Sequence, residues 1–145
     1  MSYTVSKVEM WSGELEDLVG GLDRKLEPLA EAGVDLEIVV ARRQPHLPGR
    51  GIVLLGPIKG AKAQKAAAAT GLSRASDLFA LRVEGPNKPG DCARVTRLLA
   101  GASLSLRGLA ATVCGSRYVL SIGFDTEADA SKAAGLLKAA GGKKK

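Results

Sequence analysis

The amino-acid sequence predicts an α+β fold built from two copies of one βαββα unit, with antiparallel strands under two helices on one face of each sheet. Two observations carry this prediction. A glycine-containing stretch around Gly20 recurs around Gly90, 70 positions later. In both copies the apolar residues follow the order strand, helix, strand, strand, helix. Self-similarity of this kind indicates one structural unit used twice along the chain.

The first copy can be followed element by element. It begins with a predicted strand at residues 5–11 and continues into a helix whose apolar face carries Leu22, Leu26 and Leu29. Gly33 is placed to end that helix in a left-handed turn. The β-branched residues that follow predict a second strand at 34–41. The remaining elements are a hairpin loop at 42–50, a strand at 52–55, an alanine-rich helix at 60–70 and room for a short fourth strand at 71–77.

The second copy repeats this order. Its first strand, residues 78–84, places Phe79, Leu81 and Val83 on one face by strict alternation, and we expect that face to point into the core. The helix that follows repeats the apolar face of the first copy with Cys92, Val95 and Leu99. A tight turn at 114–116, a strand at 117–124 and an alanine-rich helix at 127–140 complete the copy, which has no room for a last strand. We therefore predict domains at 1–76 and 77–140, and a flexible basic tail at 141–145.

Composition narrows the functional classes. The chain has a net charge of +6, but Lys143, Lys144 and Lys145 supply three of these charges, and the other basic residues are scattered. No apolar run is long enough for a membrane helix and no signal sequence is visible at the start, so we expect a cytoplasmic protein. The two cysteines, Cys92 and Cys114, lie far apart and favour small buried side chains over a disulfide framework or a zinc site.

The residues around the two glycines resemble those of ACT domains, and the resemblance covers nearly all of the chain. In that family the loop after the first strand carries Asp or Asn followed by Pro-Gly, and the first helix ends in a phrase like Ala-Gly-Ile-Asn-Ile. The second copy reads EGPNKPGD at residues 84–91 and ASLSL at 102–106. The first copy reads EDLVGG at residues 16–21 and AGVDL at 32–36, and thus lacks the proline.

The resemblance implies two ferredoxin-like βαββαβ, ACT-like units and a regulatory module that binds an amino acid or similar effector where units meet. It also implies a homodimer and a regulated protein partner, with no cofactor. The ligand-binding residues that it implies are Asn87, Lys88, Gly90, Asp91 and Leu104 in the second copy, and Asp17, Gly20 and Gly21 in the first.

Physical reasoning supports the second-copy loop as a ligand site. Gly90 lets the backbone approach a ligand, and the amides at the helix start favour a carboxylate. Asn87 or Asp91 can accept a hydrogen bond from an ammonium group. The alternative is that Asn87 and Asp91 only cap the helix while Pro89 and Gly90 shape the turn.

Catalysis finds little support in the sequence, so we expect a protein that is not an enzyme. Glu14, Glu16 and Asp17 precede a helix, where carboxylates complement its dipole. His46 is the single histidine and has no nearby acid or cysteine for a metal site. No nucleophile or nucleotide-binding motif is present. Two other functions stay open: an RNA-binding domain, which needs exposed aromatic side chains on its central strands, and a purely structural or oligomerisation domain.

Overall fold

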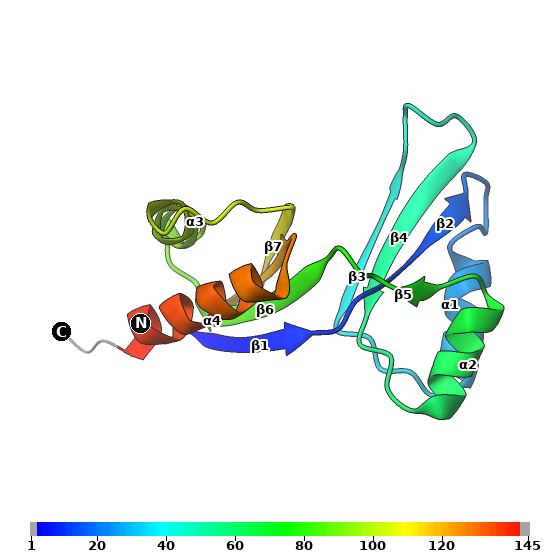
Figure 1. The fold of residues 1–145 in the computed structure, drawn as a ribbon, viewed down its shortest axis with the longest axis horizontal. Helices are drawn as coiled ribbons and strands as arrows, with labels where there is room; N and C mark the ends of the chain where they lie inside the picture. The colour runs from blue at the N-terminus through cyan, green and yellow to red at the C-terminus, as the bar shows by residue number, and fades with distance from the viewer. Residues whose placement is uncertain (1–2, 143–145) are drawn as a thin grey trace. The chain divides into compact units, whose positions relative to one another are not determined.

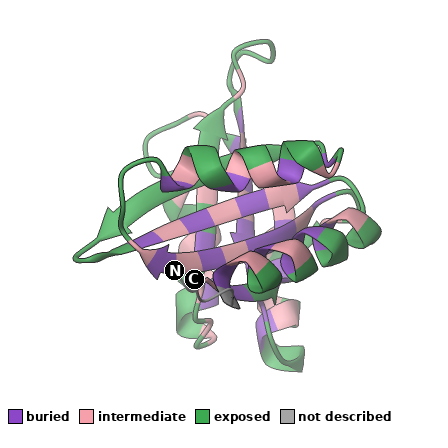
Figure 2. Cartoon of the chain, turned by 90° about the vertical axis from the view of Figure 1, so that its left-hand side faces the viewer, coloured by how far each residue is buried: buried purple, intermediate pink, exposed green. Residues whose placement is uncertain are grey.

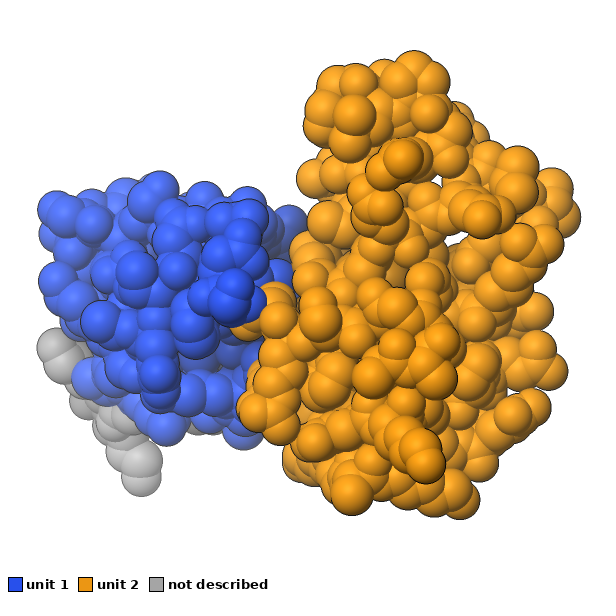
Figure 3. Space-filling model, turned by 45° about the vertical axis from the view of Figure 1, so that its right-hand side comes forward, with its two compact units in different colours: residues 1–8, 76–145 blue, residues 9–75 orange. Residues whose placement is uncertain are grey.

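The computed structural model describes residues 3–142, and its chain forms two compact units. Unit 1 consists of Met1–Val8 and Ser76–Lys145, and unit 2 consists of Glu9–Ala75. Figure 3 shows the two units in different colours. Unit 2 is thus inserted between two parts of unit 1 along the chain. Both units are α+β with four-stranded antiparallel sheets, which confirms the predicted fold class.

Unit 2 is a complete βαββαβ unit with sheet order β3-β4-β2-β5. Its elements are β2 (Trp11–Glu16), α1 (Asp23–Glu31), β3 (Ile38–Arg43), β4 (Arg50–Gly56), α2 (Ala61–Ala69) and β5 (Ser73–Arg74). The predicted short fourth strand is therefore present as β5. The core of unit 2 contains Trp11, Leu29, Val53 and Leu55 among its buried residues, because alternate residues of β2 and β4 and the apolar side of α1 face one another.

Unit 1 has the sheet order β1-β6-β8-β7, and Figure 1 labels β1, β6 and β7 of this sheet. Its elements are β1 (Thr4–Val8), β6 (Phe79–Pro86), α3 (Asp91–Gly101), β7 (Gly108–Cys114), β8 (Arg117–Phe124) and α4 (Glu127–Gly142). In Figure 2 the buried residues form bands along the central strands, whereas the helices are exposed on their outer sides. Leu81, Val83, Leu120 and Ile122 alternate along β6 and β8 and form the core with α3 and α4.

The N-terminal strand differs from the prediction. Residues 5–11 are not one strand, because β1 ends at Val8 and β2 begins at Trp11 in the other sheet. Strand β1 pairs with β6, with Val5 opposite Val83, and so occupies the edge that the second copy lacks after α4. Residues 1–8 consequently group with the second repeat and not with residues 9–75, where we had expected the first domain to begin at residue 1. The choice of partner sheet depends on long-range pairing, which local periodicity does not encode.

Three smaller expectations also need comment. Helix α4 runs to Gly142, so Gly141 and Gly142 are helical and do not belong to a tail. The predicted flexible lysines, 143–145, lie outside the described residues. We expected both cysteines to be small buried side chains. Cys92 is partly buried, whereas Cys114 is exposed at the end of β7. Within residues 3–142 no helix is long and apolar enough to cross a membrane.

The repeat is visible in the backbone hydrogen bonds. The amide of Arg24 donates to the carbonyl oxygen of Gly20 at 3.1 Å, and the amide of Arg94 donates to that of Gly90 at 2.9 Å. Gly20 and Gly90 both have positive φ, at 83° and 85°. At the other helix end, Gly33 (φ 77°) in unit 2 corresponds to Ser103 (φ 58°) in unit 1. The 70-residue offset therefore relates equivalent backbone positions.

Ser103 provides a test of this equivalence. An L-residue in the left-handed region costs about 1–2 kcal/mol, whereas glycine adopts this conformation without steric cost but gains entropy in the unfolded chain. We therefore expect Ser103→Gly to stabilise unit 1 by about 0.5–1 kcal/mol and Gly33→Ser to destabilise unit 2 by a similar amount. Urea unfolding of both variants measures the two changes. A loss of stability in Ser103→Gly would contradict the assigned backbone conformation.

Candidate functional site

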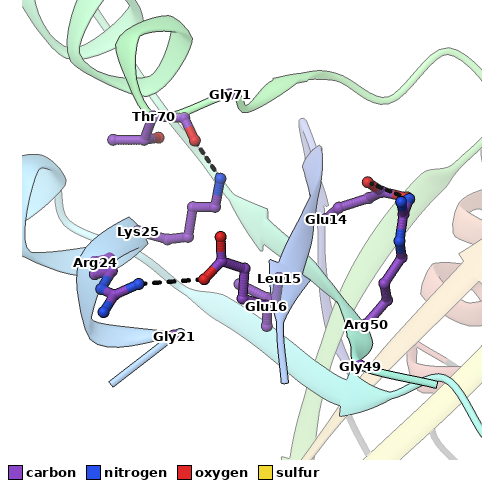
Figure 4. A pocket seen from close by; sticks show the side chains of 10 residues that line it. All are labelled: Glu14, Leu15, Glu16, Gly21, Arg24, Lys25, Gly49, Arg50, Thr70 and Gly71. Atoms are coloured by element: carbon purple, nitrogen blue, oxygen red, sulfur yellow. Dashed lines mark hydrogen bonds and ion pairs between the residues drawn. The ribbon is translucent and has the colours of Figure 1, made fainter. Parts of the chain in front are cut away.

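A pocket of about 600 Å³ lies at one end of unit 2 (Figure 4). It is formed by the end of β2, the first turn of α1, the start of β4 and the residues that follow α2. The lining residues are Glu14, Leu15, Glu16, Gly21, Arg24, Lys25, Gly49, Arg50, Thr70 and Gly71. One of the predicted site residues, Gly21, is among them.

The loop between β2 and α1 is shaped by its two glycines. Gly20 has a positive φ of 83°, and a Cβ atom there would meet no other atom within 4 Å. Gly21 is required for a different reason, because a Cβ atom at this position would lie 2.2 Å from the carbonyl oxygen of Glu16. The absence of a side chain at Gly21 thus lets the loop fold back on the end of β2. Asp17, in the same loop, accepts a hydrogen bond from Nε of Arg43 at 2.6 Å and does not line the pocket.

The charges of the pocket are arranged around α1 and the C-terminal end of α2. Arg24 Nη1 lies 3.3 Å from Glu16 Oε2, and both side chains are largely exposed. Nζ of Lys25 donates to the carbonyl oxygen of Thr70, just after the last turn of α2. The carbonyl groups at a helix C-terminus carry partial negative charge, which favours a cation at this point. In Figure 4 the side chains of Arg24, Glu16 and Lys25 and the carbonyl group of Thr70 lie on one side of β2.

A second ion pair lines the pocket on the other side of β2. Arg50 Nη1 lies 3.1 Å from Glu14 Oε1 and 3.2 Å from Oε2. Glu14 is opposite Ile52 in the β2–β4 register, and Glu16 is opposite Arg50, so the acidic side chains of β2 and the basic side chain of β4 meet at the sheet end. The side chains of both ion pairs are exposed to solvent, so their charges are accessible to a ligand. Exposed ion pairs of this kind contribute little to stability.

This arrangement suits the binding of a small zwitterion. Arg24 and Lys25 present cationic donors to a carboxylate, while Glu16 and the Thr70 carbonyl oxygen present acceptors to an ammonium group. The lining contains no histidine, cysteine or serine, and residues 3–142 hold no cluster of metal-ligating side chains. His46 lies in the exposed β3–β4 hairpin loop. The geometry supports the binding of a small charged ligand.

The predicted second-copy site has a different character. Oδ2 of Asp91 accepts a hydrogen bond from the Lys88 amide at 2.9 Å, and Oδ1 pairs with Arg94. The Asp91 carboxylate is therefore buried and engaged in capping its own loop. Asn87, Lys88 and Gly90 are exposed beside it. Leu104 lies in the core after the far end of α3, and a helix of 11 residues is about 16 Å long, so the structure does not bring Leu104 to this loop.

The charged and polar residues of this pocket that sequence reasoning missed include Arg24, Lys25, Arg50 and Thr70. Each lies in a predicted element or at its end, but nothing in the local pattern says that the start of α1 and the end of α2 are neighbours. The two helices do contact each other in unit 2. The available signal was the adjacent pair of cations, Arg24 and Lys25, three residues after Gly21, within the basic residues that we had described as scattered.

The aromatic side chains do not form a platform for RNA bases. Tyr3, Phe79, Tyr118 and Phe124 pack into the core of unit 1, and Trp11 packs into that of unit 2. These are all the aromatic residues of the chain, and stacking on single-stranded RNA needs them exposed on the open face of a sheet.

Comparison with known proteins identifies the fold. No family model and no curated protein matches the sequence. A crystal structure of a Bacteroides thetaiotaomicron protein superposes with a TM-score of 0.74 at 20% identity, over 95% of this chain and 90% of that chain. The regulatory subunit of aspartate kinase from Thermus thermophilus superposes with a TM-score of 0.66 at 13% identity, over 94% and 95% of the two chains. For the corresponding Thermus flavus subunit the values are 0.64, 16%, 99% and 98%. The chain thus has an ACT-like fold.

Proposed function

We propose that this protein is a non-enzymatic regulatory module that binds an amino acid, and that the pocket of unit 2 is where the amino acid binds. The observation that carries the proposal is the presence of two cations, Arg24 and Lys25, beside the Glu16 carboxylate and the Thr70 carbonyl oxygen in a pocket of about 600 Å³. A cavity of this size exceeds what a single amino acid needs and falls within the range of small-ligand sites.

The fold supports the same proposal. Solved structures that share it include regulatory subunits of aspartate kinase. ACT domains, which the sequence resembles, act by binding amino acids. A ligand shifts the equilibrium between two conformations of a protein only when it binds one of them more tightly. A module of this kind therefore acts by favouring one conformation, which changes its contacts with another protein. A homodimer and a regulated protein partner stay predictions of this proposal. Binding at a junction between units, which the sequence resemblance implies, is the alternative location for the amino acid.

A panel of the twenty standard amino acids, tested by thermal shift and then by calorimetry, examines the proposal. At about 100 times its dissociation constant a ligand raises the free energy of unfolding by about 2.7 kcal/mol. We expect at least one amino acid to do so with the unaltered chain. Lys25→Gln should abolish the effect, because it removes the charge beside Thr70. The matched control is Lys62→Gln, because Lys62 is an exposed lysine of α2 that does not line the pocket.

Each outcome of this experiment has a definite meaning. If Lys25→Gln binds like the unaltered chain and Asn87→Ala does not bind, the amino acid binds at the second-copy loop and the pocket assignment is wrong. If no amino acid shifts the unfolding of any variant, the regulatory proposal fails. The purely structural or oligomerisation function would then be favoured.

A further inference from the structure

A second pocket, of about 570 Å³, lies in unit 1 between α3 and the second half of α4. Its walls are apolar and are formed by Val95, Leu98 and Ala102 from α3 and by Leu136 and Ala140 from α4. Leu98 and Leu136 are partly buried and pack against the core of unit 1. A solvent-open pocket with apolar walls of this kind accommodates an aliphatic group.

The charged residues that line this pocket are both cationic. Arg94 and Arg97 lie three residues apart on α3, so their side chains project from neighbouring positions on one helix face. Arg94 is held in place by the Asp91 carboxylate and lies beside the buried hydroxyl of Tyr3. The pKa of Arg94 is raised mainly by the Tyr3 hydroxyl and also by the Asp91 carboxylate, against a smaller lowering by burial. Arg97 is exposed to solvent.

We propose that the unit 1 pocket binds an aliphatic monocarboxylate, with the chain between α3 and α4 and the carboxylate at Arg94 and Arg97. Guanidinium groups bind carboxylates through paired, charge-assisted hydrogen bonds. Among residues 3–142 no carboxylate side chain lines the pocket, so the charged groups that an ammonium ion would meet there are both cations. The unit 1 pocket therefore differs in charge from the unit 2 pocket, which carries both signs, and the two proposals stand independently.

Two glycines provide a blocking variant and its control. Gly101 lines the pocket at the end of α3, and a Cβ atom there would meet nothing within 4 Å. Gly101→Phe can therefore fill the pocket without a backbone clash. Gly135 of α4 has the same free space and does not line the pocket, so Gly135→Phe adds the same side chain to the same unit elsewhere.

The test is calorimetric titration of the full chain with decanoate, below the concentration at which it forms micelles. Decyltrimethylammonium, which has the same chain length and the opposite charge, is titrated in parallel. We expect decanoate to bind and the cation not to bind. Gly101→Phe should abolish decanoate binding, Gly135→Phe should leave it unchanged, and Arg97→Gln should weaken it about tenfold through loss of a charged hydrogen bond.

Several results would overturn the proposal. These are the absence of decanoate binding, equal binding of the anionic and cationic chains, and binding that Gly101→Phe leaves intact. Lys25→Gln, the variant of the unit 2 pocket, should bind decanoate normally. Its behaviour separates a failure of this proposal from a failure of the amino-acid proposal.

Discussion

Val5→Asp is expected to unfold unit 1 under conditions in which unit 2 stays folded. Val5 is only 9% exposed and belongs to the core cluster of unit 1, together with Leu81 and Val83. Its position in β1 is opposite Val83 of β6. Replacing an apolar side chain by an unpaired carboxylate in such a site costs about 3 kcal/mol or more.

Hydrogen exchange of the backbone amides measures this effect unit by unit. The amides of β6 and β8 should lose protection in Val5→Asp, whereas those of β4 should keep theirs. Ser6→Asp is the matched control, because Ser6 is the exposed neighbour of Val5 on the same strand. Loss of protection in β4 instead of β6 would show that the N-terminal residues belong to the 9–75 unit, and the assignment of β1 would be wrong.

Tyr118→Phe is expected to stabilise unit 1 by about 1–2 kcal/mol. Tyr118 is 4% exposed, and its hydroxyl is buried without a hydrogen-bond partner among residues 3–142. An unsatisfied buried hydroxyl costs about 1–3 kcal/mol, and the variant removes this cost while the ring keeps its packing. Tyr3→Phe is the comparison: the Tyr3 hydroxyl lies beside Arg94, so its removal should bring no such gain.

Tyr118→Phe is also expected to change how the free energy of unfolding depends on pH in alkali. Burial is the main cause that raises the pKa of Tyr118 above its ordinary value near 10 in the unfolded chain. Below about pH 10 both states hold the proton and stability is unaffected. Above it, the unfolded chain loses the proton while the folded chain retains it, so stability falls by up to about 1.4 kcal/mol per pH unit.

Urea unfolding of Tyr118→Phe and the unaltered chain, at neutral pH and at several values above pH 10, measures both effects. The stability of the variant should exceed that of the unaltered chain at neutral pH and should fall less steeply in alkali. A destabilised variant would mean that the hydroxyl has a hydrogen-bonding partner in the native state.

Much of the fold follows from local patterns in the chain. Alternating residues in β6 and β8 and the apolar face of α3 predicted these elements nearly to their ends. Gly20 and Gly90 marked the same turn in both copies, and the two φ angles agree within a few degrees. The turn at 114–116 and the short strand β5 were also predicted. These features depend on side-chain periodicity and on the backbone freedom of glycine, both of which act within a few residues.

The candidate site was predicted less completely. Gly21 lines the unit 2 pocket, but Asp17 pairs with Arg43 and Asp91 caps its own loop. The residues that supply the pocket's charges come from the ends of separate elements. Their proximity results from the packing of α1 against α2 and from the β2–β4 register, which have no signature in any single segment.

The sequence by itself determined that one βαββα unit occurs twice, where its alanine-rich second helices lie, and which face of β6 is buried. Only the tertiary structure decided that β1 completes the sheet of the second repeat and that Lys25 meets the end of α2. The physical reason is that periodicity specifies the apolar face of an element. The partner of an open sheet edge or helix end is chosen by hydrogen bonding and burial between residues far apart in the chain.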